Sequence, residues 1–229
     1  MRKLAAWFAV CFVGLLLATA AHALSLADLT GKDASGGLKE ALTQGAGKAV
    51  DLLGRADGFL GNPKVKIPLP ESIQKVEGVM RSFGMSKQAD ELITSMNRAA
   101  EAAVPEAKTL LVGAIKKMSV EDAKGILSGG DDAATQYFRR TTEAPLAEKF
   151  KPIVTKAMAR VKLAEKYDQI ASKAARFGLV REEDSHLQNY VTKKALDGLY
   201  LMIAEEEKAI RKNPADAAGK LAKKVFGAL

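Results

Sequence analysis

Apolar side chains recur every three or four residues along most of this 229-residue chain. The clearest case is the segment 184–212, whose apolar positions four residues apart are Leu187, Val191, Ala195, Leu199 and Ile203. This spacing returns the side chains to one face of an α-helix. The middle of the segment, residues 199–203, is apolar on every side, which predicts a buried central helix.

The same periodicity in the other segments predicts an all-α fold, a single compact bundle of about eight to ten helices. Aromatic residues make up only 6% of the chain, which also favours helices over an all-β fold. Ser119 and Asp122 have the spacing of a capping box, which predicts a short helix that runs through Leu127. Two successive helices are expected at 131–138, capped by Asp131, and at 146–161. Pro152 is expected to kink or split the second of them.

Residues 64–70, Lys-Val-Lys-Ile-Pro-Leu-Pro, alternate polar and apolar side chains and contain two prolines. Proline removes a backbone donor, so this stretch is expected to be an extended strap across the bundle. Alternate residues of an extended chain face one side. We therefore predict that Val65, Ile67 and Leu69 are buried, with the two lysines exposed.

The N-terminus has the layout of a secretory signal. Arg2 and Lys3 precede an apolar run at 4–17, and a small-x-small site ends at Ala23. We predict a signal peptide at 1–23, cleaved after Ala23, a flexible leader at 24–35 and a single all-helical domain at 36–229. The mature protein is expected to be exported and periplasmic, with no transmembrane segment.

Cleavage would remove Cys11, the only cysteine, and leave His186 as the only histidine. Disulfides and a cysteine-based zinc site are therefore not expected, nor is any metal site, cofactor or catalytic triad. The net charge of +8 is modest, and acidic residues are interspersed with the basic ones. This pattern does not favour a nucleic-acid partner.

The last helix places Leu221 and Val225 opposite three lysines. Short basic amphipathic helices can lie on anionic membranes, but three lysines give only weak adsorption. We predict instead that this helix docks on the bundle, against the long helix at 184–212.

Four polar side chains form the candidate ligand-binding site: Asn97, Arg98, Glu101 and Tyr137. Asn97 and Glu101 stand four residues apart on one helical face, where asparagine is a weak helix former. Tyr137 combines an apolar ring with one polar tip. The alternative interpretation is a polar network that fixes the packing.

Two other polar groups have simpler interpretations. Residues 128–132, Ser-Gly-Gly-Asp-Asp, precede a helix but lack the ending of a phosphate loop, so a tight turn is favoured. Glu207 and Arg211 stand four residues apart, and this pair is expected on a solvated face.

Several segments of the chain resemble a bacterial exported family described as a domain of unknown function. The matching segments are Gly37–Leu42, Val65–Pro70, Met96–Glu101 and Ile126–Phe138. The resemblance implies an exported, mostly helical protein and carries over no catalytic residue.

These observations favour a non-enzymatic ligand-binding or protein-interaction module of the periplasm. Its partner would be a small molecule or an envelope protein that the sequence does not identify. The alternative is an envelope-acting enzyme that uses carboxylates brought together by the fold for acid–base chemistry.

Overall fold

The computed structural model describes residues 31–71, 73–74, 82, 84, 86–177, 186–214 and 219–227. Most of these residues are helical and none of them forms a strand, which confirms the predicted all-α fold. The predicted signal peptide and residues 24–30 of the predicted leader lie outside the described residues. Residues 31–35 were expected in that leader, but they form the first turns of a helix in which Ala34 and Ser35 are buried.

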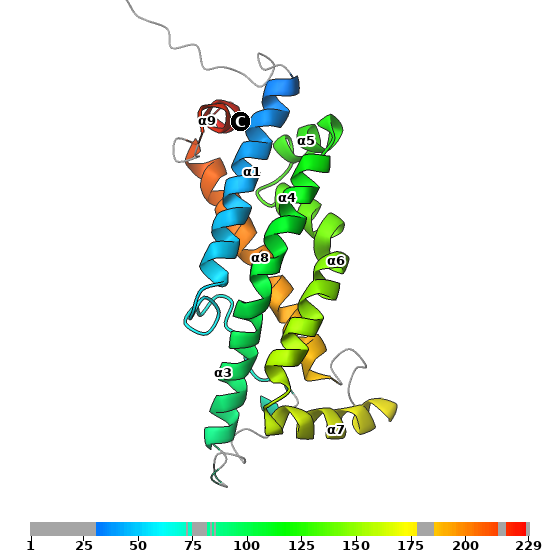
Figure 1. Ribbon diagram of the computed structural model, residues 1–229. Coiled ribbons are helices and arrows are strands. Elements are labelled where there is room, and N and C mark those ends of the chain that lie inside the picture. The colour runs from blue at the N-terminus through cyan, green and yellow to red at the C-terminus, as the bar shows by residue number, and fades with distance from the viewer. Residues whose placement is uncertain are drawn as a thin grey trace, which may run out of the picture.

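Five helices run side by side along one axis, and three others lie at the two ends (Figure 1). The axial helices are α1 (Gly31–Leu53), α3 (Ser86–Ala103), α4 (Ala107–Lys117), α6 (Ala133–Met158) and α8 (Leu187–Lys212). A 3-10 turn, η2 (Val104–Glu106), joins α3 to α4. The helices at the ends are α5 (Val120–Leu127), α7 (Lys162–Arg176) and α9 (Lys220–Phe226).

The central helix of the bundle is α8, which packs against α6, α1 and α3. At 1.5 Å per residue its 26 residues span about 39 Å. Val191, Ala195 and Leu199 are completely buried, as the sequence predicts, although Leu201 is 41% exposed. Phe59 packs so closely on α8 that a Cβ at Gly198 would lie 2.7 Å from its ring.

Helix α6 is continuous from Ala133 to Met158 and contains Pro145 and Pro152. The prediction of two separate helices in this region was therefore wrong. Leu146, Phe150 and Val154 are fully buried around the two prolines. This packing holds the helix together where a proline removes a backbone hydrogen bond.

The strap lies on the bundle as predicted. Val65, Ile67 and Leu69 are buried, whereas Lys64 and Lys66 are exposed. Residues 63–65 form a turn, so the extended part begins at Lys66.

The C-terminal helix docks on the bundle mainly through α1, whereas α8 was expected to be its partner. Helix α8 contributes Arg211, whose Cζ lies 5.9 Å from the centre of the Phe226 ring. Ala222, Val225 and Phe226 are buried. A Cβ at Gly37 of α1 would lie 2.6 Å from the Leu221 carbonyl oxygen, so α9 touches the α1 backbone. Glycine at position 37 permits this close approach.

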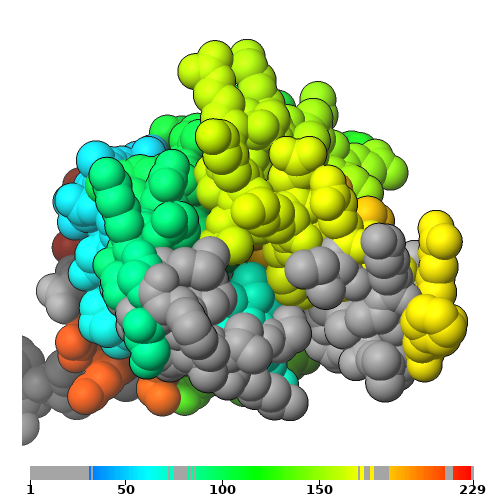
Figure 2. Space-filling model, turned by 90° about the horizontal axis from the view of Figure 1, so that it is seen from below, coloured from blue at the N-terminus to red at the C-terminus, as the bar shows by residue number. Residues whose placement is uncertain are grey.

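At the opposite end, α7 lies across the bundle and contacts α3 and α8 (Figure 1). Viewed from this end, α3 in green and α6 in yellow-green lie side by side, and α7 in yellow reaches the edge of the molecule (Figure 2). Asp168 of α7 accepts a hydrogen bond from the Leu187 backbone N–H at 2.7 Å, which joins α7 to the start of α8.

Candidate functional site

Asn97 binds the strap from the middle of α3. Its side-chain oxygen accepts a hydrogen bond from the Ile67 N–H at 2.8 Å, and its Nδ2 donates to the Ile67 carbonyl at 2.9 Å. Nδ2 also donates to the Ile93 carbonyl one turn earlier in α3. Asn97 is completely buried, so its amide pairs with the strap backbone much as a neighbouring strand would.

Glu101 lies one turn further along α3 and binds the loop that precedes the strap. Its Oε1 accepts hydrogen bonds from the backbone N–H groups of Phe59 and Leu60, at 3.0 and 3.1 Å. Arg98 donates to the Glu101 carboxylate at 2.6 Å and to Asp57 at 2.8 Å. These two carboxylates raise the pKa of Arg98 above its usual value, the hydrogen bond to Glu101 contributing most.

The structure thus brings three of the four predicted site residues together. Asn97, Arg98 and Glu101 hold the loop and strap at 57–67 against α3, the role that the packing-network interpretation assigned to them. Tyr137 lies apart from them, where α6 packs on α4. Its hydroxyl donates a hydrogen bond to the Ala114 carbonyl at 2.9 Å. The four residues do not form one site.

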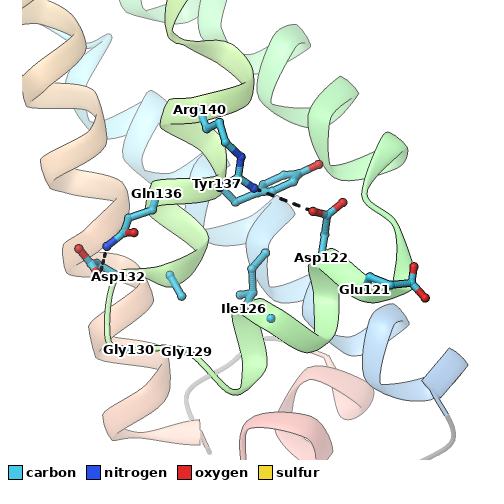
Figure 3. A pocket seen from close by; sticks show the side chains of 11 residues that line it. Glu121, Asp122, Ile126, Gly129, Gly130, Asp132, Gln136, Tyr137 and Arg140 are labelled. Atoms are coloured by element: carbon cyan, nitrogen blue, oxygen red, sulfur yellow. Dashed lines mark hydrogen bonds and ion pairs between the residues drawn. The ribbon is translucent and has the colours of Figure 1, made fainter.

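Tyr137 lines a different cavity, which we call the α5–α6 pocket and which has a volume of about 530 Å³. Helix α5, the turn after it and the first turns of α6 form its walls (Figure 3). Its lining residues are Glu121, Asp122, Gly125, Ile126, Gly129, Gly130, Asp132, Ala133, Gln136, Tyr137 and Arg140.

A guanidinium group crosses the pocket between an aromatic ring and a carboxylate (Figure 3). The Arg140 Cζ lies 5.7 Å from the centre of the Tyr137 ring, and Nη2 lies 3.9 Å from Asp122 Oδ1. Burial raises the pKa of Tyr137, so its phenol is neutral at physiological pH. The Arg140 side chain remains 67% exposed to solvent.

Asp122 is fixed by the helix to which it belongs. Ser119 and Asp122 form the capping box that the sequence predicts, with the Ser119 hydroxyl accepting from the Asp122 N–H at 3.0 Å. Asp122 in turn accepts from the backbone N–H and the hydroxyl of Ser119. These hydrogen bonds hold the pKa of Asp122 below its usual value, so this carboxylate stays ionised.

The start of α6 is capped by a residue that is distant in the sequence. The N-cap residue is Asp132 and not Asp131, and the carboxylate that accepts the free N–H groups belongs to Glu207 of α8. Glu207 binds the N–H groups of Ala134 and Thr135 at 2.9 Å and pairs with Arg211 at 3.0 Å. Glu207 is 4% exposed, so the expected solvated face was wrong for this pair. The Glu207 carboxylate already accepts from these N–H groups, so they are not available to bind a phosphate. This agrees with the predicted tight turn at residues 128–132.

Most polar residues of the α5–α6 pocket were not predicted from the sequence as site residues. Tyr137 was singled out, but Glu121, Asp122, Gln136 and Arg140 were not. The capping box gave the position of Asp122, yet nothing in the sequence shows that the end of α5 folds back beside Tyr137. Within the described part of the chain, no three acidic, histidine or cysteine side chains cluster closely enough to bind a metal ion.

Comparison with known proteins identifies the family and no individual relative. No curated protein and no solved structure matches the chain. None of the helices in the described ranges is long and apolar enough to cross a membrane. A family model described as "Protein of unknown function (DUF4197)" matches residues 28–227, and the chain belongs to this family.

Proposed function

We propose that this protein is an exported, non-enzymatic binding protein of the periplasm whose α5–α6 pocket holds a small organic cation. The proposal includes cleavage of a signal peptide after Ala23 and folding of the mature chain as one helical domain. The layout of residues 1–23 supports export. The packing of α9 on α1 supports one domain, because it joins the two ends of the described chain.

The position of Arg140 is the observation that indicates which class of ligand the pocket binds. Its guanidinium lies over the Tyr137 ring and beside Asp122, so the chain itself places a cation in the pocket. An aromatic face and a carboxylate together attract organic cations. We infer that a ligand ammonium or guanidinium takes this position when the exposed Arg140 side chain swings away.

The charge of the lining agrees with a cationic ligand. Glu121, Asp122 and Asp132 contribute three carboxylates, against the single positive charge of Arg140. An anionic ligand would meet repulsion from these groups, whereas a cation is attracted by them.

The lowered pKa of Asp122 favours ligand binding over acid–base catalysis as the role of this carboxylate. A general acid needs a carboxyl pKa raised toward the working pH, as in glycosidases. Ser119 lowers the pKa of Asp122 by donating two hydrogen bonds, from its backbone N–H and its hydroxyl, to the Oδ2 atom of this carboxylate. This carboxylate is suited to hold a charge and not to transfer a proton.

Isothermal titration calorimetry with agmatine and citrate tests the ligand class. Agmatine should bind and citrate should not. Arg140→Ala should raise the affinity for agmatine about two- to fivefold, because it removes the competing guanidinium. A site for anions would respond in the opposite direction, losing citrate affinity in the same variant. Arg160→Ala, which removes another exposed arginine of the chain, is the matched control.

A double variant, Glu121→Gln with Asp132→Asn, removes two charges of the pocket while keeping the shapes of the side chains. Agmatine affinity should fall about tenfold or more in this protein. Glu106→Gln changes an exposed glutamate outside the pocket and should leave the affinity unchanged. Equal affinities in the double variant and this control would contradict the proposal.

A further inference from the structure

The α5–α6 pocket is elongated, and a carboxylate lies at each end of it. Helix α5 and the first turns of α6 lead away from the turn that joins them, so the pocket follows both helices (Figure 3). At the turn, a Cβ added to Gly129 would lie 2.7 Å from the Cβ of Ala133, which closes this end. Asp132 lies at the closed end. Asp122 lies at the open end, where it pairs with Arg140.

About two helical turns separate the two ends. Asp132 and Arg140 stand eight positions apart along α6, with Gln136 midway, so the three side chains share one face of the helix. At 1.5 Å per residue, the backbone positions of Asp132 and Arg140 are about 12 Å apart. Asp122 and Asp132 accordingly lie on opposite sides of Ile126 (Figure 3). A single ammonium group, whose hydrogen bonds reach about 3 Å, cannot bind both carboxylates at once.

The Asp132 carboxylate is not used by the helix that it precedes. An aspartate at the N-cap normally accepts a hydrogen bond from the first N–H groups of its helix. The Asp132 side chain forms no such bond, and Glu207 accepts from those groups instead. Asp132 Oδ1 accepts from the neutral amide of Gln136, whose Nε2 lies at 3.0 Å, and no cation of the described residues pairs with this carboxylate. Its negative charge is therefore unbalanced.

The carboxylate at the open end is held in the same way. Ser119 donates both of its hydrogen bonds to Oδ2 of Asp122, and Oδ1 faces the Arg140 guanidinium at 3.9 Å. Each aspartate thus has one oxygen fixed by a neutral donor and a second oxygen directed to a cation or without a partner among the described residues. With the pair of Asp122 and Arg140 counted as neutral, Glu121 and Asp132 still leave the lining negative.

The part of the pocket between the two carboxylates suits an aliphatic chain. Ile126 and the Tyr137 ring lie between them (Figure 3). Gly125 also lines this part, and a Cβ added to it would meet nothing within 4 Å. Methylene groups placed against these residues would leave no polar group of the protein without a partner.

From the two separated carboxylates, the unbalanced charge of Asp132 and the apolar middle, we infer that the pocket binds a linear dication, a diamine or polyamine with a positive group at each end. One positive group takes the place of the Arg140 guanidinium beside Tyr137 and Asp122, and the second binds Asp132. The inference rests on the proposed function, because it keeps the proposed cation site and adds a second one. Agmatine has two positive groups, so the test needs amines that differ in their number of charges.

Isothermal titration calorimetry with matched amines provides this test. Diaminohexane and hexylamine have the same chain and differ by one ammonium group. Wild-type protein should bind diaminohexane about tenfold or more tightly than hexylamine, because the second ammonium pairs with Asp132. Diaminopropane is too short to reach both carboxylates, so its advantage over propylamine should be less than about threefold. An equal advantage for the short and the long diamine would overturn the inference in favour of attraction by charge alone.

The variant Asp132→Asn locates the second ammonium. Asparagine keeps the shape of the side chain and is an equally good N-cap residue, so the variant should fold. Its affinity for diaminohexane should fall about tenfold, whereas its affinity for hexylamine should change by less than about twofold. Asp131→Asn is the matched control, because it removes the same charge from a neighbouring exposed aspartate that does not line the pocket. Equal losses of diaminohexane affinity in the two variants would overturn the inference.

The possible results separate this inference from the proposed function. Equal binding of hexylamine and diaminohexane to the wild-type protein, or equal losses of both amines in Asp132→Asn, would overturn the inference and leave a pocket for a single cation. If neither amine binds wild type or Arg140→Ala at millimolar concentration, the inference and the proposed function both fail. Melting curves first establish that each variant is folded. If Asp132→Asn does not fold, the comparison of short and long diamines on the wild-type protein decides.

Discussion

Glu207 on α8 receives two hydrogen bonds from Thr135 on α6, one from its backbone N–H and one from its hydroxyl, both 2.9 Å long. The two residues stand 72 positions apart in the chain. Through this contact helix α6 is held in register with α8, the central helix of the bundle. Glu101 does the same for the loop at Phe59, so a buried glutamate paired with an arginine of its own helix fixes a distant backbone twice in this fold.

Removal of the Glu207 carboxylate should therefore destabilise the protein strongly. Glu207→Ala leaves two buried N–H groups without their acceptor and removes the carboxylate partner of Arg211. We expect a loss of about 3–5 kcal/mol in the free energy of unfolding. Glu205→Gln, at an exposed position on the same helix, should change it by less than about 0.5 kcal/mol. Urea denaturation compares the two variants. Similar midpoints would show that Glu207 does not hold α6 and α8 together.

Asn97 should stabilise the strap more than it stabilises the rest of the bundle. Asn97→Ala removes both hydrogen bonds to Ile67, and we expect a loss of about 2–4 kcal/mol. Thr94→Ala, at an exposed position on α3, is the control. Hydrogen exchange should show the Ile67 amide losing protection before the amides of α8 do. Uniform loss of protection across the chain would contradict a local role for Asn97.

Two glycines of α1 should respond in opposite directions to alanine. Gly37→Ala places a Cβ 2.6 Å from the Leu221 carbonyl oxygen and should destabilise the protein by about 1–3 kcal/mol as α9 shifts. Gly47→Ala meets nothing within 4 Å and should stabilise it by about 0.5–1 kcal/mol. Thermal unfolding measures both changes. A stabilising Gly37→Ala would mean that α9 does not rest on α1.

The capping box of α5 should make stability depend on pH. The pKa of Asp122 lies below its unfolded value of 3.8 in the folded protein, because Ser119 donates hydrogen bonds to the ionised form. Its stabilising contribution is therefore present above pH 3.8 and is lost as pH falls through the lower, folded-state pKa. Asp122→Asn should destabilise the protein at pH 7, and the difference from wild type should shrink toward pH 2. If the stability difference between Asp122→Asn and wild type does not change with pH, the hydrogen bonds to the ionised Asp122 carboxylate are not its cause.

The features that the sequence predicts are those set by neighbours along the chain. Alternation at Val65, Ile67 and Leu69 identified the buried side of the strap, and the spacing of Ser119 and Asp122 identified a helix start. Both patterns act over a few residues, so local physics determines them. The same holds for α8, whose apolar residues recur with the helical period.

Contacts between distant segments determine the features that the sequence does not predict. The burial of Glu207 depends on Thr135, which only the fold brings to it. Pro152 was expected to kink or split its helix, and packing around Phe150 keeps α6 continuous through this position. The candidate site divides for the same reason: Asn97 faces the strap, whereas Tyr137 faces α4 and the end of α5.

Native mass spectrometry of the untagged protein, released from the periplasm by osmotic shock, tests the central claim most directly. We predict a chain that begins at Leu24 and retains a small basic molecule. The double variant Glu121→Gln with Asp132→Asn should be recovered without that molecule. Recovery of a chain that keeps Met1 and remains in the cytoplasmic fraction, or equal occupancy in the two proteins, would contradict an exported protein that binds a cation in the α5–α6 pocket.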